Sequence, residues 1–413
     1  MGAAPQGAPA GSAAGLPLNG TRVLDLTRFI SGPYCAMYLG DLGADIIKVE
    51  HPTQGDGTRR WGSGPYPADN PYYLSVNRNK RSIGLDLKHP QGLAILIQLL
   101  ERSDVLLTNS IPGALDELGL TDARIEQLNP RLVHSQISGY GDGGPARQRG
   151  AFDFTIQAES GMMSIIGDPD GPPTKIGAPI MDVLTGMNAC IAILAALLQR
   201  QATKRTRKVA TSMLETALAS MPNIVSDYLV GDLVPQRFGN AHPNLAPYEI
   251  YETQDRWLAL GLGNEPQWER FCGIVERSDL RDDPRFATNV LRTQQRAALN
   301  KQLRPLFRQH PLAWWIQMLD TSGIPCAAVN TVPEALASGQ VKALGIVQDV
   351  AHPLYGTIKM TRSPLTLDGK TLAVRRPPPR LGEHTDAILL DVLKLTGREV
   401  GALHDAGVVA CAP

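Results

Sequence analysis

A strand-helix-strand pattern in the first fifty residues constrains the fold more than any other feature of this chain. A β-type run at residues 22–26 precedes a helical segment that starts near Ser31, and a second β-type run follows at residues 45–50. Pro33 suits the first turn of a helix, and Gly43 suits its end. Two strands joined by one helix are typical of parallel pairing, so we predict an α/β fold built on a parallel sheet.

The same alternation continues along the chain, with a helical segment at 92–101 and strands at 104–108 and 132–138. The first strand-to-helix turn lacks the GxGxxG spacing, which argues against NAD or FAD. The helix start behind Ser31 can still hold a phosphate through its free N–H groups; the alternative is an ordinary turn.

Changes of composition along the chain predict its domain boundaries. Residues 1–17 are rich in Ala, Gly and Pro without a charged start, so we interpret them as a disordered leader and not as a signal sequence. We expect residues 18–220 to form a large domain. From about Ser220 the pattern changes to helices, which assigns 221–330 to a smaller domain, and short segments return over 331–413.

Charge and cysteine content limit the partners. Lys+Arg 40 equals Asp+Glu 40, so the net charge gives no general electrostatic reason to bind nucleic acid or an anionic membrane. Five scattered cysteines without CxxC or Cys/His spacing predict neither a metal site nor a disulfide framework, and they fit a reducing cytoplasm. The most apolar window, 189–198, is shorter than the roughly 20 residues of a membrane span, so we interpret it as a core helix.

One carboxylate stands where a loop meets this buried helix. Residues 171–186 form a Gly- and Pro-rich segment that delivers Asp182 to the start of the helix, which continues to about Arg200. The simpler interpretation makes Asp182 the N-cap. The alternative is a nucleophile: the helix start would keep the carboxylate ionised, and an ionised, poorly solvated carboxylate can attack an activated carbonyl. The residues alone leave both interpretations open.

A series of ordered motifs reaches from residue 18 to residue 409. They are Val23-Leu-Asp-Leu-Thr-Arg, Gly32-Pro-Tyr-Cys, Leu42-Gly-Ala-Asp-Ile-Ile-Lys-Val-Glu, Asn77-Arg-Asn-Lys-Arg-Ser, Ser138-Gly-Tyr-Gly, Gln157-Ala-Glu-Ser-Gly-Met-Met, Asp283-Pro-Arg-Phe and Arg376-Pro-Pro-Pro-Arg-Leu-Gly-Glu-His-Thr. In these motifs the chain resembles the class III CoA-transferase family, which includes formyl-CoA transferase, carnitine CoA-transferase and the α-methylacyl-CoA racemases.

The resemblance implies a fold and a chemistry. It implies a Rossmann-like large domain formed by both chain ends, so that 331–413 returns to it, with a smaller α+β domain inserted and two chains interlocked as a homodimer. It makes Asp182 the nucleophile that carries CoA as an aspartyl thioester. Coenzyme A is then a substrate, and no permanent cofactor or metal is needed. A mobile glycine-rich loop of the family corresponds to Gly261 and Gly263.

The family's CoA contacts transfer to a set of positions in this sequence, each of which has a structural role as its alternative. The set comprises Ser31, His51, Lys80, Arg81, Asn109, Ser110, Ala114, Ser138, Gly139 and Tyr140. Lys80 and Arg81 suit the phosphates by charge. Ile111 replaces a common Arg and Ser110 an aromatic residue, which departs from the family's adenine site, and residues 203–210 lose two glycines and an aspartate.

Two other functions within the same family resemblance are disfavoured. The racemase branch uses a His directly before the aligned Asp153, and here that position is Phe152, which cannot carry a proton. We interpret Asp153 as structural. A CoA-binding relic without turnover is disfavoured by the intact Asp182.

The substrate prediction rests on the group that the motifs resemble most, the succinyl-CoA:glutarate CoA-transferases. We expect succinyl-CoA as donor and glutarate, or a C5 acid such as itaconate, as acceptor; formate or oxalate, carnitine-type acids and mesaconate are the alternatives. The distal carboxylate of a dicarboxylate calls for a cation. Arg59, Arg60 and Arg78 are the candidates, with Trp61 as a wall.

Overall fold

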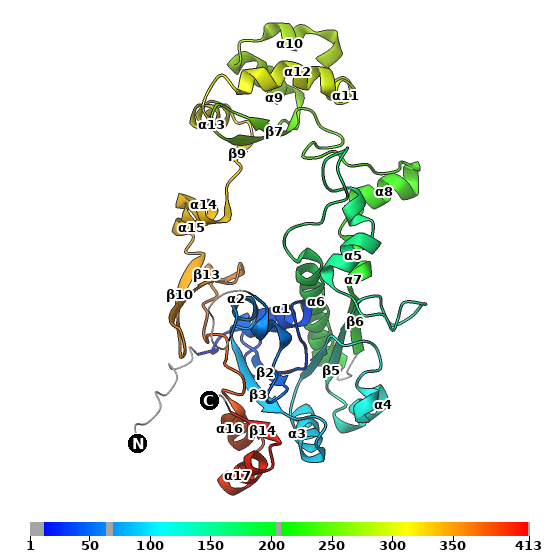
Figure 1. Ribbon diagram of the computed structural model, residues 1–413, viewed down its shortest axis with the longest axis vertical. Helices are drawn as coiled ribbons and strands as arrows, with labels where there is room; N and C mark the ends of the chain where they lie inside the picture. The colour runs from blue at the N-terminus through cyan, green and yellow to red at the C-terminus, as the bar shows by residue number, and fades with distance from the viewer. Residues whose placement is uncertain (1–11, 63–68, 204–207, 412–413) are drawn as a thin grey trace. The chain divides into compact units, whose positions relative to one another are not determined.

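The computed structural model describes residues 12–62, 69–203 and 208–411 (Figure 1). The chain forms two compact units. The first comprises the chain up to Ser160, Ile176–Ser226 and Leu344 onward; the second comprises Gly161–Lys175 and Asp227–Ala343. The boundaries expected from sequence, at 220 and 330, stay a prediction, and most of the expected leader lies outside the described residues.

A seven-stranded sheet organises the first unit. Its order is β14-β3-β2-β1-β4-β5-β6, and all neighbours are parallel except β14, which runs antiparallel to β3. The strands are β1 (Arg22–Asp25), β2 (Asp45–Glu50), β3 (Lys80–Leu85), β4 (Val105–Thr108), β5 (Val133–Ser138), β6 (Lys208–Ser212) and β14 (Val409–Ala410). The predicted α/β fold with a mostly parallel sheet is confirmed.

The strand order fixes where a ligand can bind. Strand β1 pairs with β2 on one side and with β4 on the other, so the chain reverses its direction of winding between β1 and β4. This is the order of a doubly wound Rossmann-type sheet, which leaves a crevice at the carboxyl ends of the two strands. The residues that follow β1 and β4 therefore meet at this edge.

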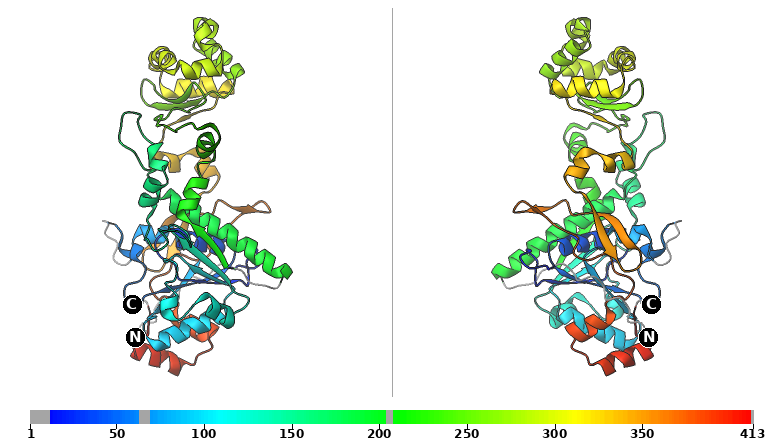
Figure 2. Two further views of the ribbon diagram at one scale, coloured as in Figure 1. Left: turned by 90° about the vertical axis from the view of Figure 1, so that its right-hand side faces the viewer. Right: turned by 90° about the vertical axis from the view of Figure 1, so that its left-hand side faces the viewer.

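Helices cover both faces of the sheet. Adjacent residues of one strand point to opposite faces, so Val23 joins the core with α1 (Ser31–Asp41) and α6 (Ile180–Thr203), while Leu24 joins the core on the other face. That second core contains α3 (Pro90–Glu101) and α17 (Gly397–Asp405). Figure 2 shows α6 as the long helix that crosses the sheet.

Further elements complete the first unit. They are η1 (Gly57–Arg60), α2 (Pro71–Ser75), η2 (Asp116–Leu118), α4 (Asp122–Leu128), α5 (Asp153–Glu159), α7 (Met213–Ala219), β10 (Val347–His352), β11 (Gly356–Thr361), β12 (Thr366–Leu367), β13 (Lys370–Thr371), α16 (Thr385–Ala387) and the π-helical turn η5 (Ile388–Val392). The chain leaves this unit within α8 (Pro222–Gly231).

Helix α6 is the central helix of the first unit. Its 24 residues exceed the apolar window seen in the sequence, and among the described residues it alone is long and apolar enough to cross a membrane. This is weak evidence for a span, because the core helix of a globular protein meets the same criterion. Met181, Ala189 and Ile193 are fully buried, which fits the predicted core helix.

The second unit contains a small antiparallel sheet. Strands β7 (Tyr248–Glu252), β8 (Trp257–Gly261) and β9 (Cys326–Ala328) pair in that order. Their core packs against α9 (Glu265–Ile274), α12 (Arg296–Phe307) and α13 (Leu312–Thr321), around the buried Trp315. The other elements are η3 (Met162–Ser164), α10 (Ser278–Asp282), η4 (Pro284–Phe286), α11 (Asn289–Gln294), α14 (Val332–Ala337) and α15 (Gly339–Ala343).

Candidate active site

Asp182 lies in the first turn of α6, against the first residue of α1. The Ser31 hydroxyl and backbone N–H face the Asp182 carboxylate closely enough to lower its pKa. This contact requires the two helices to approach closely, and Gly186 permits it: a Cβ at residue 186 would lie 2.4 Å from the Ser31 carbonyl oxygen. The start of α1, which follows β1 at the crevice, thus holds the carboxylate in place.

Asp153 performs the capping that the simpler interpretation gave to Asp182. Its Oδ2 accepts from the Met181 N–H at 2.7 Å, and its Oδ1 accepts from Gln157 Nε2 at 2.6 Å. The Gln157 Oε1 in turn accepts from the Ile176 N–H at 2.9 Å. Asp182 is therefore not the N-cap: it belongs to the first turn of α6, and Asp153 ties α5 to the start of that helix.

The charge state of Asp182 differs from the sequence expectation. Burial and, secondly, the neighbouring Asp153 carboxylate raise the pKa of its carboxyl to about 7, although Ser31 acts to lower it. The helix start was expected to keep Asp182 ionised, and that expectation is wrong: desolvation and like-charge repulsion outweigh the Ser31 hydrogen bonds. Near neutral pH the site holds comparable populations of carboxylate and carboxylic acid.

An aromatic cluster, defined here as Phe29, Trp61, Tyr72 and Phe152, lies beside the two carboxylates. Phe29 stacks on Trp61 at 5.1 Å between ring centroids and meets Phe152 edge-on at 6.0 Å, and Trp61 meets Tyr72 at 5.5 Å. Burial and the charges of Asp182 and Asp153 raise the pKa of the Tyr72 hydroxyl, which marks its proximity to them. Phe152 is 58% exposed. The cluster offers an apolar surface for an acyl chain.

One side chain, that of Asn109, bridges the loops that follow β1 and β4. Asn109 Oδ1 accepts from the Arg28 N–H at 2.9 Å, and Asn109 Nδ2 donates to the Arg28 carbonyl at 2.6 Å. The amide thus joins the loops that follow the two strands. These contacts engage the Asn109 side chain, which gives it a structural role at the position predicted to contact CoA.

The other predicted contacts near this edge follow β2 and β5. His51 directly follows β2 and is exposed, with Nδ1 accepting from the Thr53 N–H at 3.3 Å. Ser138 ends β5, and its Oγ accepts from the Gly141 N–H at 3.0 Å. Gly139 follows; a Cβ there would lie 2.3 Å from the Ala151 Cβ. The Tyr140 hydroxyl donates to Glu159 Oε2 at 2.7 Å.

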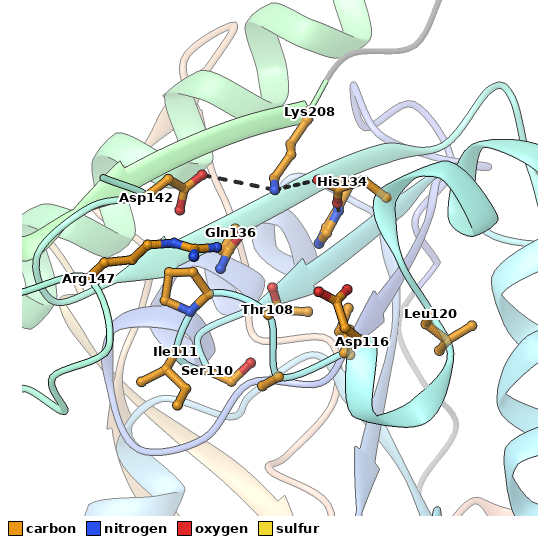
Figure 3. Close-up of a pocket in the computed structure, with 15 residues that line it drawn as sticks. Thr108, Ser110, Ile111, Asp116, Leu120, His134, Gln136, Asp142, Arg147 and Lys208 are labelled. Carbon is orange, nitrogen blue, oxygen red and sulfur yellow. Dashed lines mark hydrogen bonds and ion pairs between the residues drawn. The ribbon is translucent and has the colours of Figure 1, made fainter. Parts of the chain in front are cut away.

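A pocket of about 100 Å³ lies beside the turn that follows β4 (Figure 3). Its wall contains the predicted CoA contacts Ser110 and Ala114, together with Thr108 and Gln136 of the neighbouring strands. The predicted CoA contacts that follow the carboxyl end of strand β4, Ser110 and Ala114, thus lie together at one edge of the sheet.

Two cations that the predicted contacts omitted also line this pocket. Lys208 Nζ pairs with Asp122 at 2.8 Å and lies 3.9 Å from Asp142. The exposed Arg147 extends toward Gln136, and among the described residues no ion pair is assigned to its guanidinium (Figure 3). Arg147 is an accessible cation where Ile111 replaces the family's Arg. The sequence does contain an indication of this role, because Arg147 is a basic residue within a Gly- and Pro-rich loop.

Lys80 and Arg81 do not line this pocket. They begin β3, at the amino end of the sheet. Lys80 is fully buried, and its amine donates to Asp25 at 3.1 Å, to the Pro33 carbonyl at 2.9 Å and to Asn77 at 2.9 Å. All three N–H donors of the amine are therefore used within the protein. Arg81 pairs with both oxygens of Asp45, at 2.8 Å and 2.5 Å.

Arg59 and Arg78 are also engaged internally. Arg59 is 5% exposed and donates to both oxygens of Glu50, to Asp69, to the Tyr73 hydroxyl and to the Pro379 carbonyl. Arg78 is 3% exposed and pairs with both oxygens of Asp41. Both guanidinium groups are thus buried in ion pairs within the protein.

Of the candidates for the distal carboxylate, this leaves Arg60, which is exposed. It directly precedes Trp61 of the aromatic cluster. Gly261 and Gly263 belong to the second unit, where Gly261 contacts the Tyr248 ring and the Gly263 N–H donates to Gln267 at 2.8 Å.

The fold and the site together define a doubly wound α/β protein with a partly buried, desolvated carboxylate, that of Asp182, beside the crevice of its sheet. The chain belongs to CoA-transferase family III, whose family model matches residues 18–385. The resemblance predicted from the motifs is confirmed, and the chain is a CoA-transferase, an enzyme class whose substrates are CoA thioesters and carboxylic acids.

The relatives agree with this membership. The chain is 37% identical to a human succinyl-CoA:glutarate CoA-transferase, covering 95% of this chain and 90% of that protein. It is 36% identical to a succinate–glutarate CoA-transferase of Agrobacterium fabrum, covering 91% and 96%. Among solved structures, a CAIB/BAIF family protein from Brucella suis superimposes with a TM-score of 0.82 at 33% identity, covering 91% and 99%.

Proposed function

We propose that this enzyme transfers CoA from succinyl-CoA to glutarate, or to a C5 acid such as itaconate, through an aspartyl-CoA thioester on Asp182. The observation that carries the proposal is the partly buried, desolvated Asp182 carboxylate, which lies against Ser31 at the start of α1 and has a pKa of about 7. A poorly solvated carboxylate is more nucleophilic than one in water, and the apolar cluster beside it can exclude water from a reactive acyl intermediate.

The reaction begins when the ionised Asp182 attacks the thioester carbonyl of succinyl-CoA. The C–S bond breaks, which gives an aspartyl-succinyl anhydride and CoA thiolate. The thiolate then attacks the aspartyl carbonyl, releasing succinate and leaving aspartyl-CoA. The acceptor carboxylate repeats both steps in reverse and departs as its CoA ester. Ser31 donors hold the Asp182 oxygens throughout, so positioning and oxyanion stabilisation supply the catalysis.

Two cations are proposed to bind the charged ends of the substrates. Arg147 takes the CoA phosphates at the pocket beside Ser110 and Ala114, in place of the family's Arg at Ile111. Arg60 takes the distal carboxylate of the dicarboxylate, while Trp61 contacts its methylene groups. These roles rest on the exposure of the two guanidinium groups and on their neighbours.

The test of substrate class is a panel of acyl-CoA donors and carboxylic acids with products read by mass spectrometry. We expect transfer from succinyl-CoA to glutarate to exceed transfer to formate, oxalate or a carnitine-type acid by at least about tenfold in kcat/KM. An enzyme that used those acids and left every dicarboxylate untouched would disprove the proposed substrate.

Replacing Asp153 by Asn tests the proposed charge state of the nucleophile. Loss of the neighbouring negative charge lowers the pKa of Asp182, so the acidic limb of the kcat/KM profile moves to lower pH by roughly one unit. The ionised form is the nucleophile, so activity rises through pH 7 in the parent and earlier in the variant. Glu126→Gln, on the exposed side of α4, is the control and leaves the profile in place. If the acidic limb did not move in Asp153→Asn, the pKa that it reports would not be that of Asp182.

The proposed homodimer and the cytoplasmic location accompany this function. Helix α6 presents Ile191 at 63% and Leu198 at 69% exposure, an apolar face that a second chain can cover. Light scattering on the purified protein is expected to give the mass of two chains.

A further inference from the structure

A sulfur, a nitrogen and an oxygen ligand converge at the β14 edge of the sheet, remote in the fold from the α1–α6 contact. Asp386 lies in α16, His404 near the end of α17, and Cys411 directly after β14. His404 Nε2 lies 2.8 Å from Asp386 Oδ1, Cys411 Sγ lies 3.2 Å from the same oxygen, and Sγ lies 3.7 Å from Nε2. The three side chains occupy the corners of one small triangle.

The backbone that carries these side chains is fixed by its own hydrogen bonds. The Thr385 hydroxyl donates to the Ala410 carbonyl at 2.7 Å and accepts from the Gly84 N–H at 3.1 Å. Asp386 and Cys411 are the residues that follow Thr385 and Ala410, so this bridge sets their separation. The buried Leu403 anchors the third element, α17, to the core.

The geometry points to a binding site for a divalent transition cation of the zinc type, held by Asp386, His404 and Cys411, with water as the fourth ligand. Ligand atoms around tetrahedral zinc lie roughly 3.3–3.6 Å apart, given bond lengths of about 2.0–2.3 Å. The three observed separations agree with this within about 0.5 Å. Thiolate, imidazole and carboxylate together favour zinc over magnesium or calcium.

The ligand set balances the charge of a divalent cation. Bound as thiolate and carboxylate, Cys411 and Asp386 carry two negative charges, and the Cys411 proton is released to solvent on binding. Sequence spacing does not reveal the site, because Asp386 lies 18 residues before His404.

Cobalt binding to the full-length, chelator-treated protein, without an added metal-binding tag, tests the site. We expect one Co²⁺ per chain with a thiolate-to-cobalt absorption band, and Zn²⁺ that displaces it. Cys411→Ser removes the band and His404→Ala weakens Zn²⁺ affinity at least about 100-fold by calorimetry, while Cys326→Ser, in the second unit, changes neither. Parent protein without the band, or a band retained in Cys411→Ser, would overturn the proposal. CoA transfer is not its readout, so it stands independently of the proposed function.

Discussion

Asp182→Asn is expected to abolish CoA transfer, with turnover lower by at least about three orders of magnitude. The amide keeps the shape of the side chain and can still accept from Ser31, but it cannot form the anhydride or the aspartyl-CoA thioester. Incubation of the parent enzyme with succinyl-CoA and hydroxylamine should convert Asp182 to a hydroxamate, which peptide mass spectrometry locates. The variant should show no such adduct.

The same substitution should also change the stability of the protein. Asp182→Asn lowers turnover but is expected to raise the free energy of unfolding. The pKa of Asp182 is about 7 in the folded chain against an ordinary value of 3.8, so the folded state resists its ionisation. That cost is absent below the unfolded value and complete above pH 7. Asp182→Asn should therefore raise the free energy of unfolding at pH 8, by at most about 4 kcal/mol, and change it little at pH 4.

Two measurements decide between a nucleophile and a merely structural carboxylate. Glu126→Gln, which removes an exposed carboxylate, should retain parent turnover and parent stability. An Asp182→Asn enzyme that folds normally and transfers CoA at the parental rate would rule out covalent catalysis by Asp182. Loss of turnover combined with increased stability at pH 8 is the pattern that a strained, functional carboxylate produces.

Several elements of the first unit were predictable from local pattern, and their order in the sheet was not. Pro33 and the apolar periodicity that follows it identify α1, and the run at 45–50 identifies β2 with its bounds. The pairing of β1 with β4 joins Leu24 to Leu106, more than eighty residues apart, and no local signal specifies it. The crevice depends on that pairing.

Charge type alone could not separate ligand-binding cations from buried ones. Lys80 and Arg59 have the chemistry that a phosphate or a carboxylate requires, but their partners Asp25 and Glu50 lie in other segments. Only the folded chain shows that these groups neutralise one another inside the protein. Arg147 is the converse case, since its exposure at the pocket gives it a potential role that its sequence position did not.

The pKa of Asp182 illustrates the same limit. The helix start was visible in the sequence and argued for an ionised carboxylate. The opposing influences are burial beneath α1 and the charge of Asp153, which precedes Asp182 by 29 residues along the chain. Both arise from tertiary packing, so the sequence predicted the position of the carboxylate and the wrong direction for its pKa.

Gly186→Ala is expected to destabilise the first unit by roughly 2–4 kcal/mol and to reduce transfer by at least about tenfold. The added methyl group would lie 2.4 Å from the Ser31 carbonyl oxygen and 3.3 Å from the Cys35 nitrogen, both of them backbone atoms. Neither can rotate away, so α1 and α6 must separate. That displacement removes the Ser31 donors from Asp182, which raises the pKa of the carboxyl further and disorders the nucleophile.

Gly401→Ala is the matched control, because it makes the same change inside helix α17 of the same unit. No atom lies within 4 Å of a Cβ at residue 401, so the better helix propensity of Ala should increase stability by about 0.5–1 kcal/mol and leave turnover unchanged. Thermal unfolding and succinyl-CoA transfer, measured side by side, separate the two cases. If Gly186→Ala were as stable and as active as Gly401→Ala, the close approach of α1 and α6 would not be what positions Asp182. A lower unfolding temperature in Gly186→Ala and a higher one in Gly401→Ala, with turnover lost only in the first, would show that Asp182 is positioned correctly only when residue 186 lacks a Cβ.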